Sequence, residues 1–310
     1  MNDIAQPSLQ SLSGKDKVLL TLLHLLSRLP LSFLQGMGSV LGRLMARRTS
    51  GKTYSVVLRN LELCFPDETE AWHQETAREN LIHTGKLWLE FSKTWGMPPE
   101  YSIAQITQVH NEYLFHEALA AGNGTLAIAP HFGNWELMNA WLCLHSAPTI
   151  MYKPVKDKCI NQFVLEARGR LHTTLVPTDD RGVKALFKCL KKNGFTAVLP
   201  DHVPTDNGGI YAPFFGISTL TGVIAPKLLN RTGCNAVMIS CARRHAAAGF
   251  EITFTLPDPE IYNTDLAIST AAMNRSIENM IRSNPAQYQW TYKRFKQNET
   301  LKDPYLRNKS

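Results

Sequence analysis

Hydrophobic residues in the first third of the chain recur at the three- and four-residue intervals of an α-helix. The most leucine-rich stretch, Val18 to Leu44, is interrupted by polar, charged and helix-breaking residues at His24, Arg28, Pro30, Gln35 and Arg43. A regular membrane span needs about 18 apolar residues with few charges. The pattern therefore predicts a pair of helices, or one tilted span ending at Arg43. Helical spacing continues from Thr69 to Phe91, so we expect an all-helical N-terminal third.

From about Gly122 the pattern changes to short β-type runs that alternate with helical stretches. The predicted strands are Thr125 to Ala129, Thr149 to Tyr152, Thr174 to Val176, Phe195 to Leu199, Ala236 to Cys241 and Phe250 to Leu256. Strands that alternate with helices are typical of layered α/β folds. We therefore expect an α/β fold with a mixed sheet flanked by helices.

Charge adds information about partners. The 310 residues include 33 Lys and Arg against 26 Asp and Glu, a net charge of +7. This balance favours acidic partners: phospholipid headgroups, phosphorylated sugars, nucleic acid or an acidic carrier protein. Between Lys15 and Arg59 eight basic residues face one acidic residue, Asp16. We predict that residues 15–48 dock on an anionic membrane surface, with residues 1–14 loose before them. The alternative is a buried helical hairpin of an ordinary soluble domain.

The six cysteines are irregularly spaced, contain no C-x-x-C pair and fall partly inside apolar runs. This pattern predicts reduced, buried thiols facing a cytoplasm rather than a disulfide framework or a zinc knuckle. No short apolar core leads to a small-residue cleavage site, so we expect no signal peptide.

Candidate chemistry is concentrated between Ala127 and Glu136. An apolar strand ends at Pro130, His131 follows, and Gly133 and Asn134 supply a turn and a helix cap. If His131 lies on the turn and Glu136 folds back from the first helical turn, the two side chains can meet. An imidazole held by a carboxylate is fixed in one tautomer and becomes a better base, which deprotonation of an alcohol requires.

Two other kinds of chemistry lack their sequence patterns. There is no G-x-S-x-G serine, so the attacking oxygen would come from the substrate. There is no H-E-x-x-H or comparable spacing, so we expect no metal ion. The structural alternative is that His131 is a satisfied core histidine and that Glu136 complements a helix dipole.

The His131-x-x-x-x-Glu136 pattern resembles the lipid A biosynthesis lauroyl/myristoyl acyltransferase family. Further matching segments follow in the family's order, namely Arg59-Asn60-Leu61 with Cys64-Phe65-Pro66, Tyr152-Lys153-Pro154, Leu199-Pro200-Asp201, Pro213-Phe214-Phe215-Gly216, and Gln287-Tyr288-Gln289-Trp290 ahead of Lys293-Arg294-Phe295. The resemblance extends from about Val18 to Phe295. Many members have Gln where this chain has His202, which we interpret as a loop residue rather than a second base.

The resemblance implies a glycerolipid acyltransferase-like core in residues 49–310, without a bound cofactor, at the cytoplasmic face of the inner membrane. It implies transfer of a fatty acyl chain from acyl carrier protein to the 3-hydroxyl of a chain on a Kdo-bearing lipid A precursor. His131 would be the general base, Glu136 its orienting partner, and Arg168 a group for the oxyanion or a substrate phosphate. Substrate-binding positions would be Asn134, Lys153, Asp201, Lys293 and Arg294.

Several of these residues also have simpler interpretations. Without the family, Arg168 is a solvated helix charge, and Asp201 shapes a turn. Gly36, Gly38 and Gly42 imitate a dinucleotide loop, but no strand precedes them, so close helix packing is the better interpretation. Aromatic and basic residues alternate from Tyr288 to Lys296; alone they fit nucleic acid as well as a lipid surface, and the resemblance favours lipid over nucleic acid.

Two other functions remain open from the sequence. One is an acyltransferase that uses acyl-CoA on another glycolipid or glycerophosphate. The other is a basic membrane-binding protein without catalytic activity.

Overall fold

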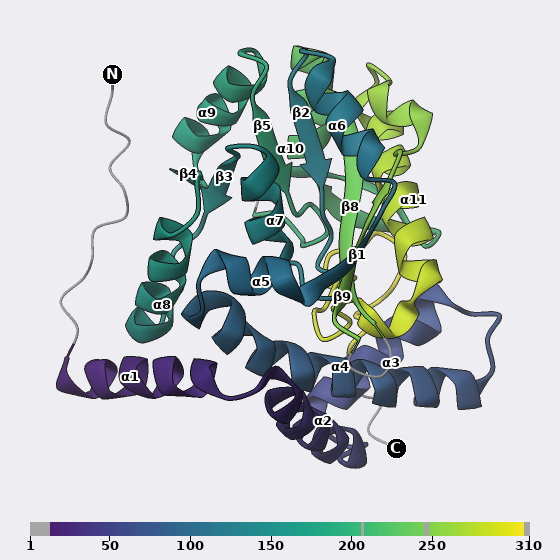
Figure 1. Ribbon diagram of the computed structural model, residues 1–310. Helices are drawn as coiled ribbons and strands as arrows, with labels where there is room; N and C mark the ends of the chain where they lie inside the picture. Colours follow the sequence, from purple (N-terminus) through teal and green to yellow (C-terminus); the bar gives the residue numbers. More distant parts are fainter. Residues whose placement is uncertain (1–12, 206–207, 245–247, 307–310) are drawn as a thin grey trace.

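A computed structural model describes residues 13–205, 208–244 and 248–306 (Figure 1). Its α-helices are α1 (Gly14–Arg28), α2 (Leu31–Arg47), α3 (Lys52–Cys64), α4 (Glu70–Gly96), α5 (Pro99–Gln105), α6 (Glu112–Ala120), α7 (Met138–His145), α8 (Lys158–Gly169), α9 (Asp180–Leu190), α10 (Ile224–Thr232) and α11 (Leu266–Ser283). Its strands are β1 (Ile106–His110), β2 (Thr125–Ile128), β3 (Thr149–Tyr152), β4 (Thr174–Pro177), β5 (Phe195–Val198), β6 (Gly209–Phe214), β7 (Ile217–Gly222), β8 (Asn235–Arg243) and β9 (Phe250–Thr255). Short 3-10 helices span Pro259–Tyr262 and Pro285–Gln287.

Seven strands form one mixed sheet in the order β1-β9-β8-β2-β5-β3-β4, in which only β8 and β9 pair antiparallel. Alternate residues of the central strands point to opposite faces, as the pleat requires. Leu126 and Ile128 pack in a core with α9, α10 and α11, whereas Ala127 and Ala129 pack with α6 and α7. The predicted mixed α/β sheet flanked by helices is confirmed.

The first four helices form a layer below the sheet in Figure 1. The break at Leu29 and Pro30 turns α2 by 112° from α1. Among the described residues no single helix is long and apolar enough to cross a membrane, although α1 and α2 together meet that length and composition test as a bent pair. Of the predicted loose segment, residues 1–12 lie outside the described residues, and Ser13 and Gly14 begin α1 through a capping box with Asp16.

Large apolar side chains of α1 and α2 face outward rather than into a core. They are Val18, Leu19, Leu22, Leu25, Leu29, Phe33, Met37, Val40, Leu41 and Leu44, and exposure reaches 62% for Val18 on α1 and 54% for Phe33 on α2. The alternative of a hairpin buried in a soluble domain is therefore wrong for this face. Many large apolar side chains exposed on two adjacent helices are typical of an interaction site.

The glycines of α2 allow close packing against α4. A Cβ on Gly42 would lie 2.4 Å from the Cα of Ile82, and one on Gly85 would lie 2.2 Å from the carbonyl oxygen of Gly38. Only glycine permits this approach of two helix backbones. The packing interpretation of the Gly36 to Gly42 segment is confirmed for Gly38 and Gly42, whereas Gly36 has open space.

The six predicted strands are present within one or two residues of their expected bounds. Three further strands escaped prediction. β1 lies at the sheet edge and carries polar residues, so it shows no alternation. The hairpin β6–β7 turns through Phe215 and Gly216, both with positive φ, and contains Pro213. Glycine and proline within such short runs conceal the period-two signal.

Candidate active site

His131 stands just beyond the central strand β2. Its loop is held from two sides: Gly133 N–H donates to the Gln287 carbonyl (2.9 Å), and Gln289 N–H donates to the His131 carbonyl (3.0 Å). Gly133 has φ +60°, and a Cβ there would lie 2.0 Å from the Cys241 carbonyl oxygen. The position therefore requires glycine, and the loop is fixed by β8 and the C-terminal segment.

Asp201 is the carboxylate that meets His131. His131 Nδ1 lies 2.8 Å from Asp201 Oδ1, and the His131 backbone N–H donates to Oδ2 (3.0 Å). Ile128 of β2 pairs in register with Val198 of the parallel strand β5. His131 and Asp201 lie at the same distance along the chain beyond these two paired residues, and this places them next to each other.

Asp201 is only 2% exposed. Burial alone would raise its pKa, but the His131 imidazole and its hydrogen bonds outweigh burial and hold the pKa well below its usual value. Asp201 is thus a buried anion that accepts from Nδ1–H, and Nε2 is the nitrogen of His131 that remains for a substrate hydroxyl.

His202 continues the site as part of an aromatic stack. Its ring is parallel to the ring of His131, with centroids 3.9 Å apart, and it stacks on Tyr292 at the same distance. Its Nε2 lies 2.8 Å from Gln289 Oε1. Burial, followed by the neighbouring His131, lowers the pKa of His202 to about 4. A neutral His202 donates to Gln289 and covers one face of the proposed base.

The predicted pairing of Glu136 with His131 is wrong. Glu136 lies in the turn before α7, and both of its carboxylate oxygens accept from Arg168 Nη2 (2.7 and 2.6 Å). Trp95 Nε1 also donates to Glu136 (3.1 Å). A guanidinium and an indole together outcompete an imidazole that already has a buried aspartate. Sequence reasoning considered only the nearby carboxylate along the chain.

Arg168 occupies the last turn of α8, and its side chain is largely buried. The interpretation of Arg168 as a solvated helix charge is therefore wrong. Nη2 donates to Glu136, and a guanidinium carries further N–H donors on Nε and Nη1. Burial raises the pKa of Tyr152, the neighbouring Arg168 guanidinium acts to lower it, and the Glu136 carboxylate adds a smaller increase.

Asn134 is fully buried, so the prediction that it binds substrate is wrong. Its Oδ1 accepts from Leu137 N–H (3.1 Å) and its Nδ2 donates to Glu90 (3.2 Å). The first bond closes the turn before α7, but α7 itself begins after Leu137 without a side-chain cap, so the predicted helix cap at Asn134 is wrong. Glu90 in turn receives two hydrogen bonds from Arg243 (2.6 and 2.5 Å) and one from Gln35 (2.8 Å). Through Asn134, this buried ion pair is connected to the loop that carries His131.

Of the two predicted basic residues near the C-terminus, Arg294 is buried and Lys293 is partly exposed. Arg294 is 1% exposed and donates to the Leu220 carbonyl and the Thr221 hydroxyl (2.8 Å each), so a direct substrate contact is wrong for it. Lys293 is partly exposed over the ring of Tyr305. Lys153 is exposed directly after β3. Substrate binding by these two lysines stays a prediction.

Sequence reasoning also missed several residues of the site. Trp95, Glu90 and Arg243 come from α4 and β8, and nothing in their local sequence marks them. The pairing of His131 with Asp201 had an available signal. Both residues directly follow strands that the sequence predicts, and side chains beyond the carboxyl ends of adjacent parallel strands meet at one edge.

Comparison with known proteins identifies the family of this chain. The model of the family described as bacterial lipid A biosynthesis acyltransferase matches residues 9–297. The chain belongs to this family. It is therefore an acyltransferase, and the alternative of a non-catalytic membrane-binding protein is wrong.

Individual relatives cover most of the chain at low identity. The lipid A biosynthesis lauroyltransferase of Escherichia coli is 27% identical over 275 residues, 88% of this chain and 89% of the relative. The palmitoleoyltransferase of the same organism is 26% identical over 278 residues, 89% of each. A phosphatidylinositol mannoside acyltransferase of Mycobacterium tuberculosis is 26% identical over 175 residues, 55% of this chain and 54% of the relative.

Proposed function

We propose that this acyltransferase moves a fatty acyl chain from acyl carrier protein to the 3-hydroxyl of an acyl chain on a Kdo-bearing lipid A precursor. The observation that carries the chemistry is the His131–Asp201 pair at the end of the two central parallel strands. The names of the Escherichia coli relatives support lipid A as the acceptor class. We assign His131 as the general base and Asp201, in place of Glu136, as its positioning residue.

The reaction proceeds by direct transfer. His131 Nε2 removes the acceptor hydroxyl proton while the oxygen attacks the thioester carbonyl carbon. Asp201 stabilises the imidazolium that forms, because it is a buried anion at 2.8 Å from Nδ1. As the carbon–sulfur bond breaks, the imidazolium returns its proton to the leaving thiolate. Arg168, positioned by Glu136, stabilises the developing oxyanion or a phosphate of the acceptor.

The decisive experiment compares Asp201→Asn with Glu136→Gln. We expect about a 10²- to 10⁴-fold fall in kcat for Asp201→Asn, because a neutral amide no longer holds the required tautomer. His131→Ala should abolish measurable transfer. Because His131 and Asp201 act as one unit, the double variant His131→Ala with Asp201→Asn should be scarcely slower than His131→Ala alone. Glu136→Gln should lower kcat because the neutral amide no longer positions Arg168. Its effect on the activation free energy should add to that of Asp201→Asn, since the two residues belong to different pairs.

Transfer is measured by mass spectrometry of lipids after incubation with acyl carrier protein and the lipid A precursor. Circular dichroism and retention on vesicles serve as controls for folding. A fully active, folded Asp201→Asn enzyme beside an inactive Glu136→Gln enzyme would return the positioning role to Glu136.

A basic surface on α9 and α10 supports an acidic protein as the acyl donor. Lys184, Lys188, Lys191 and Lys192 are exposed at helical spacing, and Arg231 of α10 reaches over the Phe187 ring beside them. Such a surface accelerates encounter with an acidic carrier and is weakened by salt. Lys184→Glu with Lys188→Glu should raise KM for acyl carrier protein at low salt with little change in kcat, whereas Arg78→Glu on α4 should not.

The second candidate function is transfer from acyl-CoA to another glycolipid or to a glycerophosphate. The phosphatidylinositol mannoside acyltransferase relatives indicate that related chains use other glycolipids. Turnover with acyl-CoA on such an acceptor, and none with acyl carrier protein on the lipid A precursor, would favour this second function.

We further propose that α1 and α2 hold the enzyme on the cytoplasmic face of the inner membrane. The exposed apolar surface of these helices adjoins unopposed basic residues, the combination that binds anionic bilayers. Leu22→Glu with Leu25→Glu should release the protein from anionic phospholipid vesicles in a flotation assay. Leu256→Glu is the matched control, because Leu256 is at least as exposed as Leu22 and Leu25 but lies after β9. Equal flotation of both variants would contradict this docking surface.

A further inference from the structure

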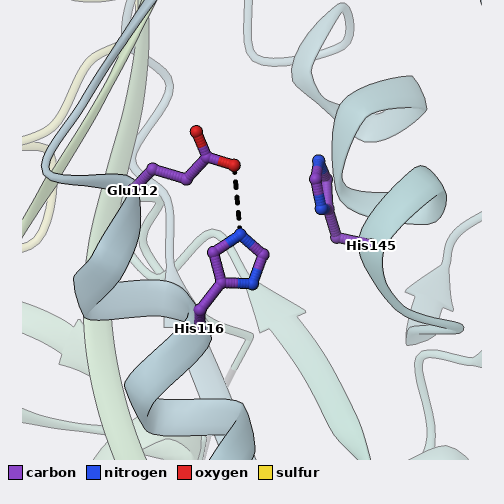
Figure 2. A group of neighbouring side chains, drawn as sticks. All are labelled: Glu112, His116 and His145. Atoms are coloured by element: carbon purple, nitrogen blue, oxygen red, sulfur yellow. Dashed lines mark hydrogen bonds and ion pairs between the residues drawn. The ribbon is translucent and has the colours of Figure 1, made fainter.

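Three side chains outside the acyl-transfer site converge between α6 and α7. Glu112 and His116 lie one turn apart on α6, and His145 is the last residue of α7 (Figure 2). Each offers one ligand atom, and these three atoms all lie within 4.8 Å of one another. Glu112 Oε1 and His116 Nε2 are already 3.0 Å apart. Such convergence of one carboxylate and two imidazoles matches the donor set of many transition-metal sites.

The backbone that carries these ligands is firmly packed. Phe115, next to His116, is fully buried and stacks on Phe254, with ring centroids 5.3 Å apart. Trp141 packs against Phe115 (5.7 Å between centroids) and supports the ring of His145 at 4.1 Å. This aromatic floor fixes the spacing of α6 and α7. Only side-chain rotations at the surface are therefore needed to close the three ligands around an ion.

We propose that Glu112, His116 and His145 form a binding site for Zn²⁺ or a similar divalent transition-metal ion. Zinc bonds of about 2.0–2.2 Å place neighbouring tetrahedral donors about 3.4 Å apart, so the triangle must contract by about 1 Å or a little more at its longest side. Two imidazoles favour Zn²⁺ over Mg²⁺ and Ca²⁺, which prefer oxygen ligands. Water would complete the coordination, because the site opens to solvent.

The sequence predicts no metal ion because its spacing patterns are local. Here two ligands are four residues apart on one helix, and the third comes from a different helix much later in the chain. The ion would join α6 to the end of α7, whose beginning follows the turn that carries Glu136. A bound ion would thus cross-link α6 and α7, and the three ligands take no part in the proposed acyl transfer.

Isothermal titration calorimetry of the tag-free full-length protein with ZnCl₂ tests this proposal, with MgCl₂ titrated in parallel. We expect one Zn²⁺ per chain, at least tenfold tighter than Mg²⁺, and a higher melting temperature with Zn²⁺ than after chelation. Co²⁺ should give the visible absorption of a low-symmetry nitrogen and oxygen site. His145→Ala and Glu112→Gln should each weaken Zn²⁺ binding at least tenfold. Glu112→Gln keeps an oxygen that can accept from His116 and so separates the metal from the hydrogen bond.

His172→Ala is the matched control, since His172 is an exposed histidine outside the cluster. It should bind Zn²⁺ like the wild type. Equal Zn²⁺ affinity in the wild type and in folded His116→Ala and His145→Ala variants would overturn the site and leave only adventitious surface binding. Loss of binding in the cluster variants while His172→Ala binds normally would establish it.

Discussion

Replacing His202 with glutamine should make the enzyme less sensitive to acid. In the folded protein, burial and His131 lower the pKa of His202 to about 4, whereas an unfolded chain has a histidine pKa near 6.5. Between these two pH values the unfolded state binds the extra proton. The contribution of His202 to the free energy of unfolding is therefore fully present above about pH 6.5 and is lost as the pH drops towards 4. Glutamine has no such titration and can still bond with Gln289.

The size of the effect follows from the difference between the two pKa values. A difference of about 2.5 between them corresponds to a total loss of roughly 3 kcal/mol once both states are protonated. At about pH 5 the loss is already about 2 kcal/mol, while at about pH 7.5 it is close to zero. The wild type should therefore lose about 2 kcal/mol more than His202→Gln between these two pH values.

Urea unfolding in a fixed detergent concentration, followed by circular dichroism, measures these free energies at each pH. His172→Gln provides the control: as an exposed histidine it should leave the pH dependence of the wild type unchanged. Equal losses of stability in the wild type and in His202→Gln would refute the buried, neutral state that we assign to His202.

Three other substitutions test the supporting structure. Glu90→Gln leaves the buried Arg243 guanidinium without its anion and should cost about 3–5 kcal/mol in urea unfolding; a cost below about 1 kcal/mol would show that this pair is dispensable. Gly42→Ala should lower the melting temperature and expose α2 to proteolysis, because its new Cβ meets the α4 backbone, whereas Gly36→Ala has open space and should be neutral or slightly stabilising. Arg168→Lys should lower kcat by about 10²-fold without unfolding, since one ammonium cannot replace the planar fork; unchanged turnover would remove Arg168 from the reaction.

The sequence predicted those parts of the fold in which burial is regular. β2 and β5 are buried at every position, so their apolar runs were visible, and α4 shows helical spacing after its Thr69 cap. The β6–β7 hairpin was not visible because its turn depends on positive φ at Phe215 and its strands contain glycine and proline. Such elements are stabilised by tertiary contacts rather than by a local pattern.

For the candidate site, the sequence located the residues but not their partners. His131, Glu136, Arg168 and Asp201 were all named, and the structure divides them into a hydrogen-bonded His131–Asp201 pair and an Arg168–Glu136 ion pair that join different elements. A local pattern reports neighbours along the chain, whereas the partner of a buried charge is set by which strands and helices lie side by side. The buried Glu90 was invisible for the same reason, because on the helix it resembles any other glutamate.

The hydrogen bonds around Glu90 connect the candidate site to α2, one of the two helices that we propose to dock on the membrane. Gln35 of α2 donates to one carboxylate oxygen of Glu90, and Asn134, three residues after His131, donates to the other. With α2 lying in the bilayer surface as proposed, these two bonds set the height of the catalytic histidine above the lipid. An acceptor anchored in the same bilayer would then be acylated at the hydroxyl whose depth matches that height. Regioselectivity would thus be a property of how the enzyme sits on the membrane as well as of the shape of its pocket.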